Sequence, residues 1–372
     1  MNIVKHRSTH SGKLERWLGK EKIDYMGSSM KGWYGRPISI LDIPGGVKIG
    51  ADGDFSGKIS RGSFMSAMDS LEAMFTRAAK VSPATFYAGF TSISDALSRA
   101  SQGNSQRVNF NKVGVTGVVG GTNSLWRVGP QPAVGASPGN APGGTAFSSA
   151  NTGALPLANT SPGTIRLIGA DVATSVINNS LLVYDLLWGC NKTMANSGVE
   201  GVTGVPTRYQ SSTPTAEDYA GDNFLAVHIG GTALAATGHN WTTCLYRNQA
   251  GTDNQTLPSL TGNNAGIADR LDHPLQQWFA PLATGDTGIM DLAQMQCSAS
   301  VATGVVWFMI GHPLGFMSFP IINSMMPFDW LTNRDQTPRI FNDACITFLE
   351  PLKPATTATT YTGRLVYTST SS

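Results

Sequence analysis

The pattern in this chain that comes nearest to a catalytic motif is Gly-Ala-Ser-Pro-Gly at residues 135–139. It matches the G-x-S-x-G turn on which some hydrolases hold a nucleophilic serine. That turn needs a hydrophobic strand before the serine and a helix after it. Here Gly and Pro flank the motif's serine, and Pro138 follows Ser137 directly. We therefore interpret the match as coincidental.

Histidines are the next candidates for acid–base chemistry. His273 and His312 each stand directly before a proline, in Asp-His-Pro and Gly-His-Pro. Neither has a nucleophile at a recognisable spacing, and a polar residue before proline is ordinary loop sequence. His228 and His239 do not have the spacing of a metal-binding pair. The sequence therefore predicts no enzyme and no catalytic residue.

Patterns for binding cations and nucleotides are also incomplete. Asp52–Ser60 resembles the start of a calcium loop, but Ser63 occupies the position that requires a bidentate acid. A tight Asp-Gly turn between two short strands accounts for the same residues. The Gly-rich stretch 114–121 lacks both G-x-G-x-x-G and the Lys-Ser/Thr of a P-loop. We predict no metal and no cofactor.

Cys190, Cys244, Cys297 and Cys345 are spread about fifty residues apart, without a C-x-x-C pair. An even number would allow two disulfides, but each cysteine stands in an apolar or strand-like context, which is typical of a buried free thiol. The N-terminus shows no apolar stretch typical of a signal peptide. These features favour folding in a reducing, cytoplasmic compartment.

Charge is distributed unevenly along the chain. Charged residues make up 13% of the 372 residues, compared with ~25% in typical soluble proteins. None occurs between Arg127 and Arg166, or between Asp291 and Asp329. An isolated soluble protein normally keeps a charged surface that separates it from its neighbours. Such long neutral stretches indicate a subunit that is surrounded by other copies or by partners.

Positive charge concentrates at the N-terminus, where the first 61 residues hold 11 of the 26 basic residues and six acidic ones. Breaker sequences such as Gly-Trp-Tyr-Gly-Arg-Pro predict that residues 1–60 form an extended basic arm. Its predicted contacts with a neighbouring subunit are Trp17, Trp33, Tyr34 and Arg36. Binding to nucleic acid by phosphate neutralisation and stacking is an alternative. Docking is favoured because acids are mixed in and no run of arginines exists.

The rest of the chain divides into three segments. Residues 61–104 are predicted to form a helical hairpin, or one long helix broken at Pro83, because apolar residues recur at helical spacing. The apolar face of its second helix would carry Phe86, Phe90, Ile93 and Leu97. Residues 105–163 are predicted to be a Gly/Pro/Ala-rich loop or linker, since they show no hydrophobic period. Residues 164–372 are predicted to form a β-rich body.

Short apolar runs separated by Gly, Asn, Asp and Thr predict the strands of this body. The clearest runs are 181–188, 224–229, 241–246, 305–310, 345–349 and 364–368. We predict a mainly β fold with a small N-terminal helical part (α+β), in which a β-sandwich or jelly-roll-like body carries an extended arm. Gly311 and Gly315 interrupt the apolar stretch 301–328, which predicts two buried strands joined by a turn. A membrane-associated protein is the alternative for that stretch.

The arm, the low charge and the Thr/Ser/Asn/Gly-rich β body, for example residues 356–362, resemble virion structural proteins of tailed bacteriophages. The resemblance implies a capsid shell subunit or a shell-stabilising decoration protein, made in the host cytoplasm and located in the virion. Its partners would be copies of itself and other virion proteins, with no membrane; a tail component stays open. The main alternative is a β-sandwich carbohydrate-binding module or glycan-active protein, since eight Trp and nine Tyr could stack on sugars.

Overall fold

The computed structural model describes residues 93–101, 105–157, 165–331 and 338–369. All described residues belong to one compact unit, residues 86–372. The predicted arm contacts Trp17, Trp33, Tyr34 and Arg36 lie outside the described residues. The same is true of the calcium-like segment and of most of the predicted helical hairpin.

The described chain is mainly β, as predicted, and its strands pair antiparallel in two large sheets. The outer sheet has the order β15-β5-β18-β1-β3, and β16 also pairs with β5. Its strands are β1 (Ser105–Val113), β3 (Pro130–Gln131), β5 (Ile165–Thr174), β15 (Met326–Asp329), β16 (Arg339–Ile340) and β18 (Thr360–Ser369). The central sheet has the order β2-β17-β6-β14-β8, and β4 pairs with β6. Its strands are β2 (Asn123–Ser124), β4 (Thr145–Ala146), β6 (Asn179–Thr193), β8 (Phe224–Ile229), β14 (Val305–Phe319) and β17 (Ile346–Glu350).

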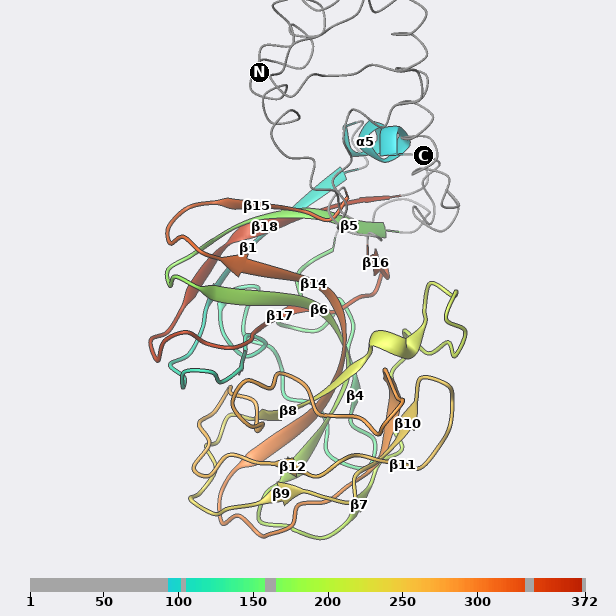
Figure 1. Cartoon of the computed structure of the whole chain (residues 1–372), viewed down its shortest axis with the longest axis vertical. Coiled ribbons are helices and arrows are strands. Elements are labelled where there is room, and N and C mark those ends of the chain that lie inside the picture. Colours follow the sequence, from blue (N-terminus) through green and yellow to red (C-terminus); the bar gives the residue numbers. More distant parts are fainter. Residues whose placement is uncertain (1–92, 102–104, 158–164, 332–337, 370–372) are drawn as a thin grey trace, which may run out of the picture. The chain divides into compact units, whose positions relative to one another are not determined.

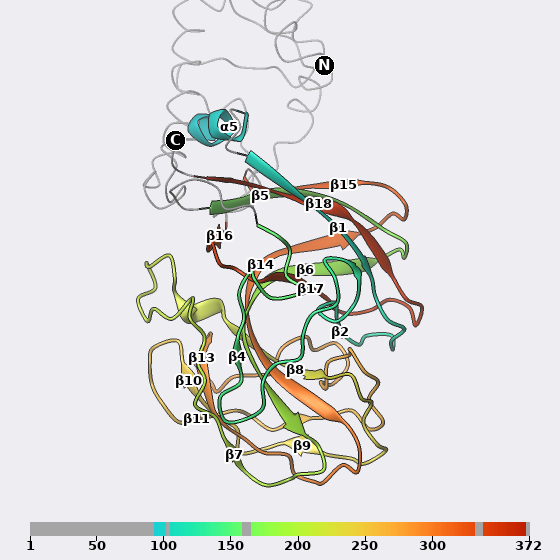
Figure 2. The same ribbon diagram turned by 180° about the vertical axis from the view of Figure 1, so that it is seen from behind.

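The outer and central sheets pack face to face around a first hydrophobic core (Figures 1 and 2). Alternate residues of each strand point inward, as in other β-sandwiches. Val108 and Phe110 of β1 are buried from one side, and Phe348 of β17 is buried from the other. The rings of Phe110 and Phe348 lie 4.5 Å apart between centroids, so the two sheets are in direct contact.

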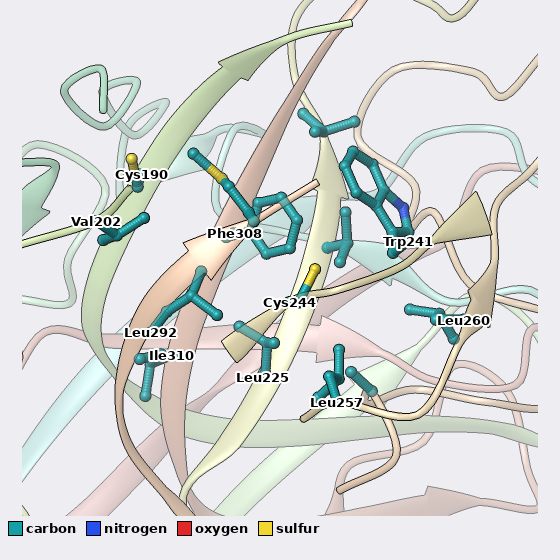
Figure 3. Packing of buried hydrophobic residues seen from close by; sticks show 14 of the residues in the cluster. Cys190, Val202, Leu225, Trp241, Cys244, Leu257, Leu260, Leu292, Phe308 and Ile310 are labelled. Atoms are coloured by element: carbon teal, nitrogen blue, oxygen red, sulfur yellow. The ribbon is translucent and has the colours of Figure 1, made fainter. Parts of the chain in front are cut away.

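A second core lies beyond the first sandwich, where the far halves of β6 and β14 continue. A smaller sheet, β11-β10-β13-β7, and the pair β12-β9 contribute to it. These elements are β7 (Glu200–Gly201), β9 (Asn240–Trp241), β10 (Leu245–Asn248), β11 (Gln255–Thr256), β12 (Leu260–Thr261), β13 (Ile289–Met295) and the 3-10 turn η2 (Ala220–Asp222). Figure 3 shows Phe308 and Ile310 of β14 packed with Leu225, Trp241 and Leu292 in this core.

β6 and β14 each contain one bulge and contribute buried side chains to both cores. In the ladder, Ile310 is paired with Trp188 and Gly311 with Leu186, so Leu187 is the extra residue of β6. Leu314 is likewise extra on β14. A bulge reverses the faces on which side chains alternate. The predicted turn at 311–315 is therefore wrong: this segment is the bulged middle of one strand, which tolerates Pro313 beside the bulge.

The segment after β1 is a packed covering layer of the central sheet. Trp126, Phe147 and Ala154 are buried against Leu182 and Tyr184 on the face of the sheet opposite the first core. The prediction of a loop or linker over 105–163 holds for the mostly irregular backbone of 114–157 but is corrected in two ways. Its first nine residues form β1, whose polar outward residues conceal the strand pattern, and large buried side chains hold most of the described remainder in place.

The described part of the predicted hairpin is helix α5 (Ile93–Ser101). Ala96 is fully buried with Ile168 and Leu331, whereas Leu97 is 53% exposed. The predicted apolar face is wrong at Leu97, because the helix uses a small side chain to approach the outer sheet closely. In the described part of the chain, no helix is long and apolar enough to cross a membrane. All four cysteines are free and buried, as predicted.

Candidate interaction surface

Four connecting loops meet at one end of the first sandwich, on the left in Figure 1 and on the right in Figure 2. They are residues 114–122, 175–178, 320–325 and 351–359, and we call them together the charge-free end. Backbone hydrogen bonds join them to one another or to adjoining strand ends. The Gly117 N–H donates to Thr356 O (2.9 Å), and the Asn178 N–H donates to Phe319 O (2.8 Å). The Asn323 N–H donates to Thr174 O at 2.8 Å.

No Asp, Glu or Arg occurs in these loops, and their single charged residue, Lys353, is buried. Large apolar side chains are exposed instead, each between 39% and 57%. They are Val118, Val119, Ile177, Ile321, Ile322, Met325 and Leu352. Exposed apolar side chains grouped in this way are common where proteins bind other macromolecules. Depletion of charge is also typical of the centre of a protein interface.

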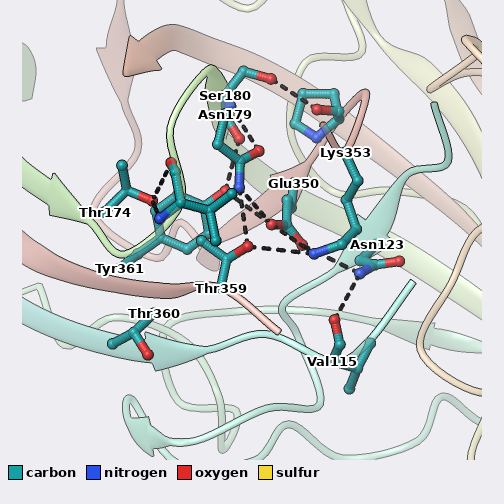
Figure 4. Close-up of polar contacts among 12 residues, drawn as sticks. Val115, Asn123, Thr174, Asn179, Ser180, Glu350, Lys353, Thr359, Thr360 and Tyr361 are labelled. Atoms are coloured by element: carbon teal, nitrogen blue, oxygen red, sulfur yellow. Dashed lines mark hydrogen bonds and ion pairs between the residues drawn. The ribbon is translucent and has the colours of Figure 1, made fainter. Parts of the chain in front are cut away.

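A buried ion pair between Lys353 and Glu350 lies at the base of the charge-free end (Figure 4). Lys353 Nζ donates to both carboxylate oxygens of Glu350, at 3.0 Å each, and neither side chain is more than 1% exposed. Lys353 Nζ also lies 3.3 Å from Thr359 Oγ1. Two charges so far from water are tolerated only when both are paired and their remaining hydrogen-bonding positions are filled.

Neutral donors from other parts of the sandwich complete the coordination of Glu350. Asn123 Nδ2 donates to Glu350 Oε2 at 3.2 Å, and Asn179 Nδ2 donates to Oε1 at 2.7 Å. The Tyr361 hydroxyl also donates to Oε1 at 3.1 Å, and burial raises the pKa of that phenol well above its ordinary value. Asn123 follows the first loop, Asn179 follows the second, and Glu350 and Tyr361 bracket the fourth. The cluster therefore ties three of the four loops to one point.

A second buried ion pair fixes the covering layer. Arg208 binds Asp185 through two hydrogen bonds, Nε to Oδ2 at 2.9 Å and a terminal nitrogen to Oδ1 at 2.7 Å. Its other terminal nitrogen donates to Phe147 O at 2.9 Å, and the Cys345 N–H donates to Asp185 Oδ1 at 2.8 Å. Burial raises the pKa of Asp185, and the hydrogen bonds from Arg208 oppose that rise. This pair joins β6 to the covering layer and to the start of β17.

The histidines that the sequence marked as candidates pack against structural partners. His273 is 2% exposed, and its Nε2 accepts the backbone N–H of Val227 at 2.9 Å. His312 stacks on Tyr209 with ring centroids 3.7 Å apart. Burial lowers the pKa of His273 to about 4 and that of His312 to about 3, so both rings are neutral at pH 7.

His239 and His228 are buried as well. His239 Nε2 lies 2.8 Å from Asp272 Oδ2, which also accepts the Trp241 indole N–H at 2.8 Å. Burial lowers the pKa of His239, but the hydrogen bond and charge of Asp272 outweigh this and raise it overall. Burial lowers the pKa of His228, which lies 3.5 Å from Asp269. The two rings therefore have different acidic neighbours, Asp272 for His239 and Asp269 for His228.

His273 makes the stability of the fold sensitive to acid. Its pKa in the folded state lies below the ordinary 6.5, so its contribution is complete above pH 6.5 and is lost as pH falls toward 4. Between pH 7 and pH 5 we expect this residue alone to remove about 2 kcal/mol of unfolding free energy. In His273→Gln, a neutral side chain can still accept the Val227 N–H. Urea denaturation at pH 7 and pH 5 should therefore show that the variant loses less unfolding free energy than the wild type. Equal losses in the two chains would contradict this account.

The remaining chemical motif has no supporting structure. Ser137 is exposed in irregular backbone, with neither a strand before it nor a helix after it. Gly135 is needed there because the Trp126 ring occupies the space of a β-carbon. Among the described residues, no group of three His, Cys, Asp or Glu side chains could hold a metal ion.

Comparison with known proteins adds little to this geometry. No protein-family profile matches the sequence, and no curated protein matches it. A chain from the structure of infectious bursal disease virus, Gt strain, is 10% identical. The alignment covers 71% of this chain and 80% of that one, with a TM-score of 0.15. A likeness this low carries no argument about fold or function.

Proposed function

We propose that this chain is a non-enzymatic structural subunit of a large assembly, a bacteriophage virion, as a capsid shell subunit or a shell-stabilising decoration protein. The charge-free end is the observation that carries the proposal. Ile177 is exposed on a loop that the buried polar cluster fixes through Asn179. Ile321 and Ile322 are exposed on the neighbouring loop, where the Asn323 N–H donates to Thr174 O. When another subunit covers such a surface, the burial of apolar area stabilises the complex by roughly 25 cal/mol per Å².

The proposal places the subunit in the virion, with copies of itself and other virion proteins as its partners. The N-terminal arm and the neutral β surfaces would make the contacts. It assigns no catalytic step. Nucleic acid stays a second partner for the basic arm, less favoured than a neighbouring subunit.

The glycan-binding alternative receives less support from the described aromatic residues. Binding to sugars needs an indole or phenol face that is open to solvent. Among the described tryptophans, all except Trp278 are buried in the cores. Trp278 is half-buried, and Phe224, Phe279 and Phe316 meet its ring at 4.7–5.3 Å between centroids. Trp278→Ala in a glycan array tests whether this ring binds sugars.

Deletion of residues 1–60 tests the role of the arm. We expect the shortened chain to unfold cooperatively in urea but to remain monomeric in mass photometry, at concentrations where the full chain assembles. The reason is that an extended arm contributes affinity by becoming ordered on a neighbour rather than by completing its own core. Normal assembly of the shortened chain would disprove this role. The four-residue variant Trp17→Ala, Trp33→Ala, Tyr34→Ala, Arg36→Ala should reproduce the loss with the chain length almost intact.

A further inference from the structure

The outer sheet ends in β1, whose backbone no described residue pairs along most of one side. The backbone groups of even-numbered residues in β1 point toward β18. The bond from the Gly114 N–H, just after the strand, to Thr359 O (2.7 Å) shows this alternation. The backbone groups of odd-numbered residues point away from β18, as the bond from the Val113 N–H to Gly129 O (2.9 Å) shows. On that side β3 pairs only with Asn111 and Lys112. The backbone groups of Arg107 and Asn109 therefore point away from β18, and no described residue bonds them.

The edge of β8 in the central sheet shows how this fold protects a strand elsewhere. The Ile229 N–H donates to Arg270 O at 2.8 Å, and the Val227 N–H donates to His273 Nε2 at 2.9 Å. A loop and a histidine ring thus cover β8. An uncovered edge is a template for pairing with another chain, and proteins usually block it. β1 has no proline and no bulge from Ser105 to Phe110 that would do so.

Lys112 explains why the cover of β1 stops where it does. Its buried Nζ donates to Val128 O at 2.7 Å and to Pro132 O at 3.0 Å. These bonds hold the ends of the β3 loop against the last residues of β1. Because β3 is only two residues long and is followed by Pro132, it does not extend alongside Asn109.

We infer that the open edge of β1 is a docking site for an extended segment from the arm of another copy, residues Ile38–Ile43. Six residues, Ile-Ser-Ile-Leu-Asp-Ile, lie here between Pro37 and Pro44. Prolines cannot donate to a ladder, so they limit pairing to this run. It has as many residues as the open stretch Ser105–Phe110. In the register described next, Ser39–Ile43 lie opposite Gln106–Phe110, and Ile38 lies beyond the open stretch, beside the β3 pairing of Asn111. The inference rests on the proposed function, since it assigns the surface on which the arm binds.

Charge and pattern agree with one antiparallel register. Asp42, the only charged residue of the run, would lie opposite the exposed Arg107, and Ile40 opposite Asn109. Leu41 would then lie opposite Val108, on the side of the first core. Opposite charges in directly paired positions stabilise a sheet. In this register the N–H groups of Ile40 and Asp42 donate to β1, and that of Leu41 points away.

Two proline variants with different effects on the ladder test the inference. Ile40→Pro removes a donor that the register uses, whereas Leu41→Pro removes one that it does not use. Amide hydrogen exchange at Arg107 and Asn109 is the readout, in the assembled full chain. We expect about a hundredfold slower exchange in the wild type and in Leu41→Pro than in Ile40→Pro. Equal exchange in all three chains would overturn the inference.

Mixing full-length chains distinguishes a neighbour's arm from the chain's own arm. Isotope-labelled Ile40→Pro chains are assembled with an excess of unlabelled wild type. Slow exchange at the labelled Arg107 and Asn109 supports docking by another copy, and fast exchange overturns it. Mass photometry of the wild type separates the two claims. Assembled wild type with fast exchange at Arg107 refutes the docking site alone, whereas a wild type that stays monomeric with and without other virion proteins refutes the proposed function as well.

Discussion

Lys353→Met is expected to lower the free energy of unfolding by about 3–5 kcal/mol, because it leaves the Glu350 carboxylate buried without a cation. Asn123, Asn179 and Tyr361 would still donate to it, but neutral donors do not balance its charge. Urea denaturation at pH 7 measures the loss. The loops 114–122, 175–178 and 351–359 should also become more sensitive to protease, since this cluster ties these three together.

Two comparison variants make the Lys353 result specific. The double variant Glu350→Gln, Lys353→Met removes both charges and should recover a large part of the lost stability. Arg364→Met breaks a much more exposed ion pair with Asp171, which is 2.7 Å long, and should cost less than about 1 kcal/mol. If Lys353→Met costs no more than Arg364→Met, the cluster does not support this end of the sandwich.

The double variant Ile321→Asp, Ile322→Asp is expected to weaken assembly by a hundredfold or more, in the manner of charges placed at the centre of an interface. Both side chains are exposed in the single subunit, at 57% and 43%, so stability of the subunit should change little. Mass photometry measures assembly and urea denaturation measures stability, on the same preparations.

Val199→Asp, Val205→Asp is the matched control for the charge-free end. These valines are 54% and 50% exposed, close to the two isoleucines, but lie outside the four loops. The two valine substitutions add the same charge to the chain as the two isoleucine substitutions. Assembly should persist in this control and fail in the isoleucine variant. Equal behaviour of the two would show that added charge, rather than the charge-free end, controls association.

The sequence predicted strands well wherever one strand is apolar throughout. β8 begins and ends at Phe224 and Ile229 as predicted, since all six of its residues are buried. β1 was missed because its outward residues are Arg and Asn and only Val108 and Phe110 mark its inner face. The continuity of β14 through Pro313 could not be predicted, because it depends on the register with β6 and on two bulges.

The candidate surface was only partly predictable. The charge-poor stretch before Asp329 pointed to a neutral surface, and it contains Ile321 and Ile322. Which loops gather with it is set by pairing between distant strands. For example, residues 117 and 356 are joined by a backbone hydrogen bond. The Glu-Pro-Leu-Lys sequence at 350–353 was a usable signal, because it places two opposite charges in an otherwise neutral segment.

The mass distribution of the purified full-length chain tests the central claim most directly. Mass photometry, with negative-stain imaging of the same sample, should show closed oligomers, shells or tubes whose masses are multiples of 39.3 kDa. That result is expected because neither the charge-free end nor the β1 edge is covered within the described subunit. A single species of 39.3 kDa at every concentration, with and without other virion proteins, would contradict the account.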